Sequence, residues 1–256
     1  MESAYSNITS QKYHEIFDFK LTKDELHKWQ YKNVKEFAKG FKNKTRLQRE
    51  KYSKKKLKLA KRAAILISKI PTVKFVGITG ALAMNNAGRN SDIDLMIITK
   101  SGRLWMTRLL SYMAIWLNGY KTRKPNQKNE KNKLCINLWM DENDLTWNKL
   151  DRNIYTAHEI AQIVPLVNKN NIYERFLRCN RWILNFWPNS VKILRSKKTS
   201  NFISIHLISW LMEKLAYNIQ YLYMSRKITR EVVTPTRAIF HPNDWGKIVL
   251  EKLNKI

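Results

Sequence analysis

Residues 70–99 read IPTVKFVGITGALAMNNAGRNSDIDLMIIT, and this stretch decides the fold class of the chain. Residues 72–79 are apolar and β-branched, which is typical of a buried strand. Gly80 follows directly, and residues 81–87 have the composition of a short helix. Residues 92–99 are a second strand-like run whose first positions alternate carboxylate with apolar side chains. The stretch therefore predicts a strand, a glycine turn, a short helix and a second strand.

Asp92 and Asp94 are the residues of this stretch that indicate chemistry. Side chains at positions i and i+2 of a strand point to the same face, so these two carboxylates lie side by side at the strand start. Close carboxylates repel each other unless a hard cation such as Mg²⁺ or Mn²⁺ lies between them. Gly80 lets the backbone turn so that amides at 80–82 can receive phosphate. These features together predict phosphoryl or nucleotidyl transfer.

Two other interpretations of the carboxylate pair stay open. In the first, the pair is a surface-exposed strand end that holds no ion. In the second, it is the DxD metal motif of a nucleotide-sugar glycosyltransferase. Neither accounts for the glycine turn and the short helix that precede Asp92 and Asp94.

The flanking segments complete the expected architecture. Residues 45–69 contain no Gly or Pro and carry apolar residues at helical spacing, which predicts a long helix with a cationic outer face. Residues 103–117 predict a helix and 133–140 a third strand, whereas the chain beyond Asp144 has helical patterning. We expect a basic helical N-terminal arm at 1–69, an α/β (α+β) core with a mixed sheet at 70–145, and an α-helical C-terminal domain at 146–256.

The charge of the chain indicates a polyanionic partner. Lys and Arg number 48 against 20 Asp and Glu, a formal net charge of +28. Residues 42–62 are dense in Lys and Arg, with Glu50 as their acid, which predicts contacts to nucleic-acid phosphates, RNA more than DNA. A merely solvated basic face and an anionic membrane surface are the alternatives. The residues predicted to bind nucleic acid are Arg46, Arg49, Lys51, Lys54, Lys55, Lys56, Lys58, Lys61 and Arg62.

Composition argues against several classes of protein. Apolar residues make up 44% and Gly and Pro are scarce, which is typical of a packed chain rather than a disordered one. Two cysteines are too few for a disulfide framework or a zinc cluster and favour a reducing compartment. Residues 1–19 lack the apolar core of a secretory signal, and the most apolar windows, 104–117 and 202–224, carry charged residues. We expect a cytoplasmic protein without a membrane span.

The order Thr79-Gly80-Ala81, a spacer, and Asp92-Ile93-Asp94-Leu95 resembles the signature of the DNA polymerase β-like nucleotidyltransferase superfamily. That signature is an apolar residue, Gly, then Gly or Ser, followed about a dozen residues later by Asp-apolar-Asp. The segments GRLWMTRLL, YTAHEIAQ and FHPND extend the likeness to bacterial proteins known only as nucleotidyltransferase-domain proteins. The resemblance implies a minimal nucleotidyltransferase core.

The resemblance also implies roles for individual residues. Gly80, Ala81 and the Leu82 amide would hold the triphosphate of an NTP, and Asp92 and Asp94 would bind Mg²⁺. Ala81 stands where Ser or Gly is usual. Ser91 and Arg89 are further candidates for phosphate contact.

A residue on the third strand completes one metal site in that superfamily. By position this residue is Asn137, which stands where an acid is usual and which brings no negative charge. Asp141 is the alternative, because it is expected on the same face about 13 Å further along the strand. His158 and Glu159 are expected to form a buried, hydrogen-bonded pair rather than a catalytic one.

The function implied is transfer of a nucleoside monophosphate from an NTP to a hydroxyl, with an RNA terminus as the favoured acceptor. A nucleic-acid-binding protein without activity on the same fold is the first alternative, favoured by Asn137 and Ala81. A nucleotidyltransferase that modifies a small molecule or a protein is the second.

Overall fold

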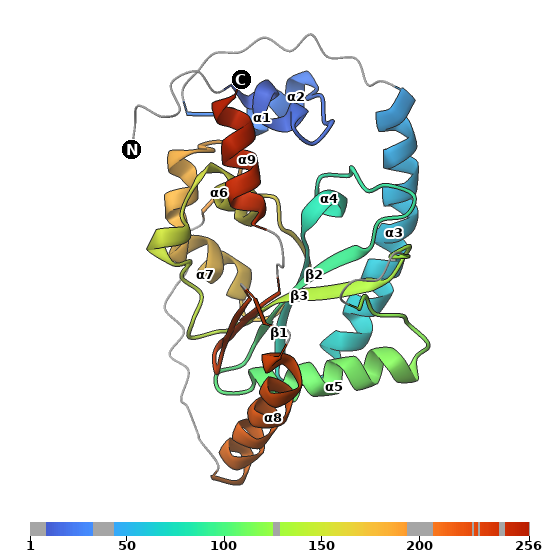
Figure 1. Ribbon diagram of the computed structural model, residues 1–256, viewed down its shortest axis with the longest axis vertical. Coiled ribbons are helices and arrows are strands. Elements are labelled where there is room, and N and C mark those ends of the chain that lie inside the picture. The colour runs from blue at the N-terminus through green and yellow to red at the C-terminus, as the bar shows by residue number, and fades with distance from the viewer. Residues whose placement is uncertain are drawn as a thin grey trace.

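The computed structural model of the chain describes residues 9–32, 44–124, 129–193, 207–226, 228–229, 231–240 and 244–255. Figure 1 shows a central sheet with helices on both of its faces. The helices are α1 (Ser10–Glu15), α2 (Lys23–Lys28), α3 (Lys44–Ser68), α4 (Gly80–Ala83), α5 (Leu104–Leu117), α6 (Ile154–Ala161), α7 (Ile172–Cys179), α8 (Leu207–Ser225) and α9 (Trp245–Asn254), with short 3₁₀ helices at Lys149–Asp151 and Arg181–Asn185. The strands are β1 (Val73–Ile78), β2 (Ile93–Thr99), β3 (Leu134–Asp141), β4 (Val164–Asn168), β5 (Val232–Thr234) and β6 (Arg237–Ile239).

Six strands of the described residues form one sheet in the order β4-β1-β2-β3-β6-β5. Strand β2 runs parallel to β3, whereas the other neighbours are antiparallel. The central strands β1 and β2 are buried along almost their whole length, as their apolar sequences predict. An α+β fold with a mixed sheet is therefore confirmed.

Alternating side chains of β2 pack into two separate cores. Leu95 and Ile97 lie in a core with residues of α3 and α5. Met96 and Ile98 lie in the other core, with residues of the N-terminal helices, α6 and α7. The sheet is therefore the middle layer of three. Asp94 has the parity of Met96, so it faces the N-terminal helices and α6.

Strand β3 contains a β-bulge at Asn137. Two consecutive residues of β2 pair with Ile136 and Leu138, so Asn137 has no partner residue in β2. The bulge turns Asn137 and Leu138 to the same face and shifts the alternation beyond them. Ile136 and Trp139 accordingly share one core although they are three residues apart. Asp141 therefore lies on the face opposite Asn137, and the expectation that the two share a face is wrong.

The C-terminal part of the chain is not purely helical, which corrects the expected α-helical domain at 146–256. Strand β4 pairs with β1 at one edge of the sheet, and the β5–β6 hairpin pairs with β3 at the other. These strands were missed because they are short and β4 contains Pro165, which is tolerated at a sheet edge.

The N-terminal part is more buried than a polar arm. Tyr13, Trp29 and Tyr31 are almost fully buried in the core that includes α6. Helix α2 ends at Lys28, and residues 33–43 lie outside the described residues. Aromatic side chains pack α1 and α2 against the sheet layer. The polar composition of this segment gave no indication of that packing.

Helices α5 and α8 pack against each other at the lower end of the molecule in Figure 1. Both have apolar sequences, as expected from the two apolar windows. None of the helices within the described ranges combines the length and the apolar character that a bilayer crossing requires.

Candidate nucleotide and metal site

Gly80 and Asp94 touch where β1 ends and β2 begins. Gly80 has φ +61°, and a Cβ at this position would lie 2.7 Å from Asp94 Oδ2. A side chain here would be both strained and in steric conflict, so only glycine fits. The Thr79 amide donates to the Asp94 carbonyl at 3.1 Å and fixes the turn against the strand. The glycine turn and the carboxylate thus form one continuous wall.

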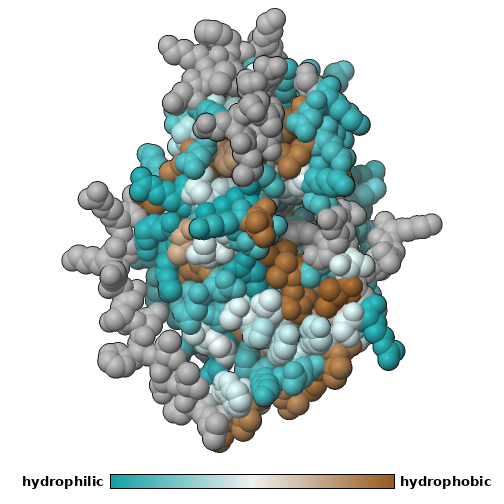
Figure 2. Space-filling model, turned by 60° about the vertical axis from the view of Figure 1, so that its left-hand side comes forward, coloured by the Kyte–Doolittle hydropathy of each residue, from teal (hydrophilic) through white to brown (hydrophobic). Residues whose placement is uncertain are grey.

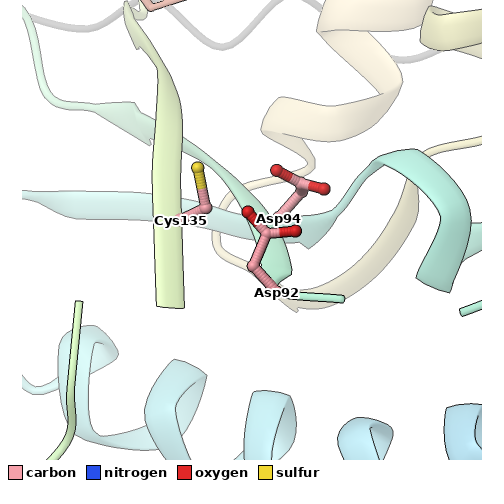
Figure 3. Close-up of side chains that lie close together, drawn as sticks. All are labelled: Asp92, Asp94 and Cys135. Carbon is pink, nitrogen blue, oxygen red and sulfur yellow. The ribbon is translucent and has the colours of Figure 1, made fainter. Parts of the chain in front are cut away.

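Asp92 and Asp94 are neighbours on the same face of the β2 start. Figure 3 shows their carboxylates side by side, with Cys135 of β3 next to them. One ligand atom from each of these three residues lies within 4.8 Å of the others. Burial, followed by the negative charge of Asp92, raises the pKa of Asp94 to about 7. A bound cation would offset the repulsion between the Asp92 and Asp94 carboxylates.

The donor atoms suit a hard divalent cation. Mg²⁺ and Mn²⁺ prefer oxygen ligands, which Asp92 and Asp94 supply. Asn137 Nδ2 donates to Asp94 Oδ1 at 3.0 Å, while its buried Oδ1 has no hydrogen-bond partner within the described chain. Burial, followed by the charge of Asp94, raises the pKa of the Cys135 thiol, so this side chain stays neutral. The residues therefore fit Mg²⁺ or Mn²⁺ held through oxygen atoms.

Arg123, in the loop before β3, supplies a positive charge to this group. Its Nη1 lies 3.1 Å from Asp92 Oδ2 and its Nε lies 2.8 Å from Glu130 Oε1. One oxygen of Asp92 therefore already has a counter-ion. A phosphate group entering beside Asp92 would meet the same guanidinium.

The carboxylates open into a cavity of about 580 Å³. This volume lies in the range of cofactor-sized pockets. Its walls come from the N-terminal segment, the Gly80 turn, the starts of β2 and α3, β3, α6 and α9. The charged side chains that line it are Asp18, Arg49, Asp92, Asp94, Arg123, Glu130 and Glu159.

Glu159 of α6 brings a further carboxylate to the cavity wall. A capping box formed by Asn153 and Thr156 sets the start of α6. Gln162 Nε2 donates to Glu159 Oε1 at 2.6 Å. Burial, followed by the charge of Asp94, raises the pKa of Glu159 to about 8. Glu159 therefore lies within electrostatic reach of the carboxylate pair.

His158 and His14 join α6 to α1 beside the cavity. Their Nε2 atoms lie 3.1 Å apart, and His14 Nδ1 lies 2.7 Å from the Ser10 carbonyl. Burial lowers the pKa of His14 to about 4 and lowers the pKa of His158, so both rings are neutral. Since a carbonyl only accepts, His14 Nδ1–H donates to it and His158 Nε2–H donates to His14. The expected hydrogen-bonded pair of His158 with Glu159 is therefore wrong, because the partner of His158 is His14.

Lys56 of α3 holds the turn that precedes Asp92. Its Nζ donates to the Ser91 carbonyl at 2.6 Å and to Asn132 Oδ1 at 2.9 Å. Lys56 is buried, and Ser91 Oγ donates to the Gly88 carbonyl at 3.1 Å. Lys56 and Ser91 therefore stabilise the turn rather than face the cavity.

The other predicted phosphate contacts divide between the cavity and its surroundings. Gly80 and Ala81 line the cavity, and Ala81 is exposed there. The Leu82 side chain is buried in the core with α3, so only its backbone is available. Arg89 is exposed and lies outside the cavity lining.

The basic residues of α3 divide into three groups, with Arg46 and Lys56 buried, Arg49 on the cavity wall and the others exposed. Arg46 is buried, pairs with Glu25 and lies with its Cζ 4.1 Å from the Phe19 ring centre. Arg49 lines the cavity and donates to Asn86 Oδ1 at 3.1 Å. The remaining residues are exposed along one stripe of α3: Lys51, Lys54, Lys55, Lys58, Lys61 and Arg62. The prediction that Arg46 and Lys56 offer their charge to a nucleic acid is corrected, because both charges are used inside the protein.

Asp141 lies at the far end of the β2–β3 ladder. It pairs across with Thr99, five residues beyond Asp94 along β2, which is about 16 Å of strand. Its carboxylate accepts from the Gly102 amide at 2.6 Å and the Asn143 amide at 2.8 Å. The structure brings Asn137, and not Asp141, next to Asp94.

Among solved structures, the chain is similar to the STING-associated CdnE c-di-GMP synthase from Capnocytophaga granulosa. The two chains are 16% identical, and the match covers 80% of this chain and 79% of that chain with a TM-score of 0.31. A score this low establishes neither a shared fold nor a shared substrate. No protein-family model matches the chain, and no curated protein matches its sequence.

Sequence reasoning missed Arg123, Glu159 and Arg49 as residues of the cavity. Arg123 lies in a loop without periodicity, and Glu159 belongs to a helix far along the chain from the Asp92 region. Their positions depend on tertiary packing. The one available signal was that Glu159 is a carboxylate in a largely apolar helical segment, where an acid requires a polar neighbour.

Proposed function

We propose that this chain is a metal-dependent nucleotidyltransferase of the DNA polymerase β-like type, acting on an NTP. The observation that carries the proposal is the contact between Gly80 and Asp94. It joins a turn that only glycine can make to a pair of carboxylates that repel each other without a cation. Arg49 and Arg123 add positive charge around the same cavity, which suits a triphosphate.

The proposed chemistry is an in-line displacement at the α-phosphorus. An acceptor hydroxyl oxygen forms a bond to this phosphorus, the bond to the bridging oxygen breaks, and pyrophosphate leaves. Asp92 and Asp94 would hold Mg²⁺ or Mn²⁺, which would stabilise the phosphate charge as a Lewis acid and lower the pKa of the acceptor hydroxyl. Amides at 80–82 bind phosphate oxygens.

Glu159 is proposed to accept the proton of the hydroxyl. It lies on the cavity wall, it is partly accessible, and one of its oxygens is oriented by Gln162. Asn137 cannot perform this role, because an amide has no basic lone pair at neutral pH. In this proposal Asn137 offers its Oδ1 to the cation and Glu159 supplies the acid that the third strand lacks.

A nucleic acid, with an RNA terminus preferred, is the proposed acceptor. The exposed stripe of Lys and Arg on α3 supports it, since these side chains have no ion pair among the described residues. A binding protein without catalysis is the second candidate. The Arg123–Asp92 ion pair favours it, because a permanent counter-ion lowers the need for a metal.

The test is incubation of the purified protein with each labelled NTP, Mn²⁺ or Mg²⁺, and total RNA. Label in RNA and release of pyrophosphate are expected, and Asp92→Ala with Asp94→Ala should abolish both. Asp151→Ala, an exposed acid on the 3₁₀ helix at Lys149–Asp151, is the matched control. Label in protein or in small molecules would assign a different acceptor. NTP binding without any transfer would favour the binding protein.

Glu159→Gln separates the proton acceptor from the metal ligands. The substitution should lower kcat by about 100-fold or more while Mn²⁺ and NTP binding stay within about twofold. A loss of Mn²⁺ affinity instead would make Glu159 a ligand. An unchanged kcat would remove Glu159 from the mechanism.

A further inference from the structure

We infer that helices α5 and α8 form a surface that docks on a membrane containing anionic lipid. This surface lies away from the cavity, at the lower end of the molecule in Figure 1. Figure 2 shows hydrophobic residues gathered toward the same end. The inference does not depend on the proposed function, because it rests on residues that take no part in the cavity.

Helix α8 turns its apolar side outward. Six residues spaced three, four and seven apart form one stripe along the helix, and each is between 51% and 75% exposed. They are Ile208, Leu211, Met212, Leu215, Ile219 and Leu222. A helix on the surface of a water-soluble domain normally buries such a stripe.

The side of α8 that contacts the protein carries Glu213 and Gln220 together with the apolar residues Ala216, Tyr217 and Met224. Glu213 accepts from the backbone amides of Trp105 at 2.6 Å and Met106 at 3.0 Å, and so caps the start of α5. Gln220 Nε2 donates to the Trp105 carbonyl at 2.9 Å and its Oε1 accepts from Arg108 at 2.5 Å. Hydrogen bonds therefore fix α8 with its apolar stripe pointing away from the core.

Helix α5 extends the same apolar surface. Leu109, Leu110, Met113, Trp116 and Leu117 are at least 40% exposed and lie on one side of the helix. The sole charged residue of α5 is Arg108, whose guanidinium lies between aromatic rings and bonds Gln220. Two adjacent helices thus present apolar stripes without an intervening charge.

Charge selects the occupant of this surface. The sole acid of the two helices, Glu213, is used by the α5 amides, whereas Lys214 and Arg226 are exposed on and just after α8. A second copy would bring two chains of +28 together with no exposed carboxylate on either helix to pair with these cations. Anionic headgroups complement them.

The aromatic residues fit the same occupant. Trp116 and Trp210 are exposed, and Lys214 Nζ lies 5.2 Å from the Trp210 ring centre. Lys214 flanks the apolar stripe of α8, and Trp together with Lys is typical of helices that lie in the plane of the membrane interface. Aliphatic side chains would enter the acyl region while Lys214 stays with the headgroups.

The experiment is flotation of the full chain with vesicles of phosphatidylcholine containing about 30% phosphatidylserine, and with vesicles of phosphatidylcholine alone. The chain should float with the anionic vesicles and much less with the neutral ones. Leu215→Glu with Leu222→Glu should reduce flotation by about tenfold or more, because acids then face the acyl region. Leu150→Glu, at a residue 92% exposed on a different surface, should leave flotation unchanged.

Thermal unfolding of each variant and light scattering of each solution complete the test. The variants should keep the wild-type midpoint, since the altered residues are exposed. Equal flotation of the double variant and the wild type would overturn the inference. An absence of flotation would overturn it as well, and a concentration-dependent dimer that the double variant abolishes would then assign the surface to a second copy.

Discussion

Asp94 and Asp141 lie near opposite ends of the β2–β3 ladder, and their surroundings differ. Asp141 accepts two backbone amide hydrogen bonds, from Gly102 and Asn143. Asp94 accepts a side-chain bond from Asn137 and lies beside the carboxylate of Asp92. Burial raises the pKa of both carboxyls, but the two amide hydrogen bonds of Asp141 act against that rise, whereas the charge of Asp92 adds to it at Asp94. A cation from outside would offset the repulsion at Asp94. The contrast separates a structural acid from a candidate ligand.

The largest expected effect is on metal binding. Asp92→Ala with Asp94→Ala should weaken Mn²⁺ binding by more than about 100-fold. Loss of a residue that only hydrogen-bonds to a metal ligand already lowers metal affinity by about 10–100-fold. Titration calorimetry or electron paramagnetic resonance of Mn²⁺ measures the change. Asp141→Asn should leave Mn²⁺ affinity unchanged and lower the free energy of unfolding by about 1–3 kcal/mol, because one of the two backbone amides that donate to Asp141 loses its acceptor oxygen. Equal Mn²⁺ loss in both variants would remove the distinction between the two ends.

The next effect is a dependence of stability on pH. The pKa of Asp94 is raised to about 7 in the folded protein, so the folded state binds the proton more tightly than the unfolded state. The free energy of unfolding should therefore fall as pH rises from about 4 to about 7, relative to Asp94→Asn, by a few kcal/mol at most.

The measurement is the free energy of unfolding in urea as a function of pH, for the wild type and for Asp94→Asn. Subtracting one pH profile from the other cancels the opposite trend of His14 and His158, whose lowered pKa values favour folding as pH rises. Saturating Mg²⁺ should flatten the difference, since the cation stabilises the charged form. A difference that does not vary with pH would mean that Asp94 titrates normally.

A smaller effect concerns the third strand. Asn137→Asp adds a negative charge beside Asp94 at almost unchanged volume, so Mg²⁺ affinity and transfer should rise by about tenfold. In the presence of a chelator the same variant should be less stable than the wild type, because like charges then face each other. Asn137→Leu, which removes both the amide donor and its oxygen, is the control and should lose Mg²⁺ affinity. Higher stability of Asn137→Asp in the chelator would argue against a close Asp94 contact.

The smallest effect separates exposed from buried cations of α3. Binding to RNA should weaken with salt, with a log–log slope of about −0.7 to −0.9 per phosphate neutralised. Reversing the exposed Lys54, Lys55 and Lys58 to Glu should shallow that slope by about two to three. Lys56→Gln should leave the slope unchanged and reduce Mn²⁺ affinity, because Lys56 supports the turn before Asp92. The reverse pattern would mean that the buried lysine contacts the nucleic acid.

The sequence by itself determined the central part of the fold and indicated where the candidate site lies. Strands β1, β2 and β3 and helices α3 and α5 follow from periodicity, because each is long or strongly apolar. Gly80, Asp92 and Asp94 were identified by local geometry alone, since i and i+2 in one strand share a face whatever the rest of the molecule does.

Only the tertiary structure decided which further residues line the cavity of the candidate site. The bulge at Asn137 moves Asp141 to the other face of the sheet. Side chains alternate between the two faces of a strand, so one extra residue reverses the face of every later side chain, and the sequence around Asn137 does not indicate this extra residue. Glu159, Arg123 and Arg49 reach the cavity through packing between segments far apart in the chain. The sequence likewise did not show which cations of α3 are buried, or that the apolar side of α8 faces away from the core. A sequence records that a helix is amphipathic, whereas which side meets the protein depends on the partners that Glu213 and Gln220 find.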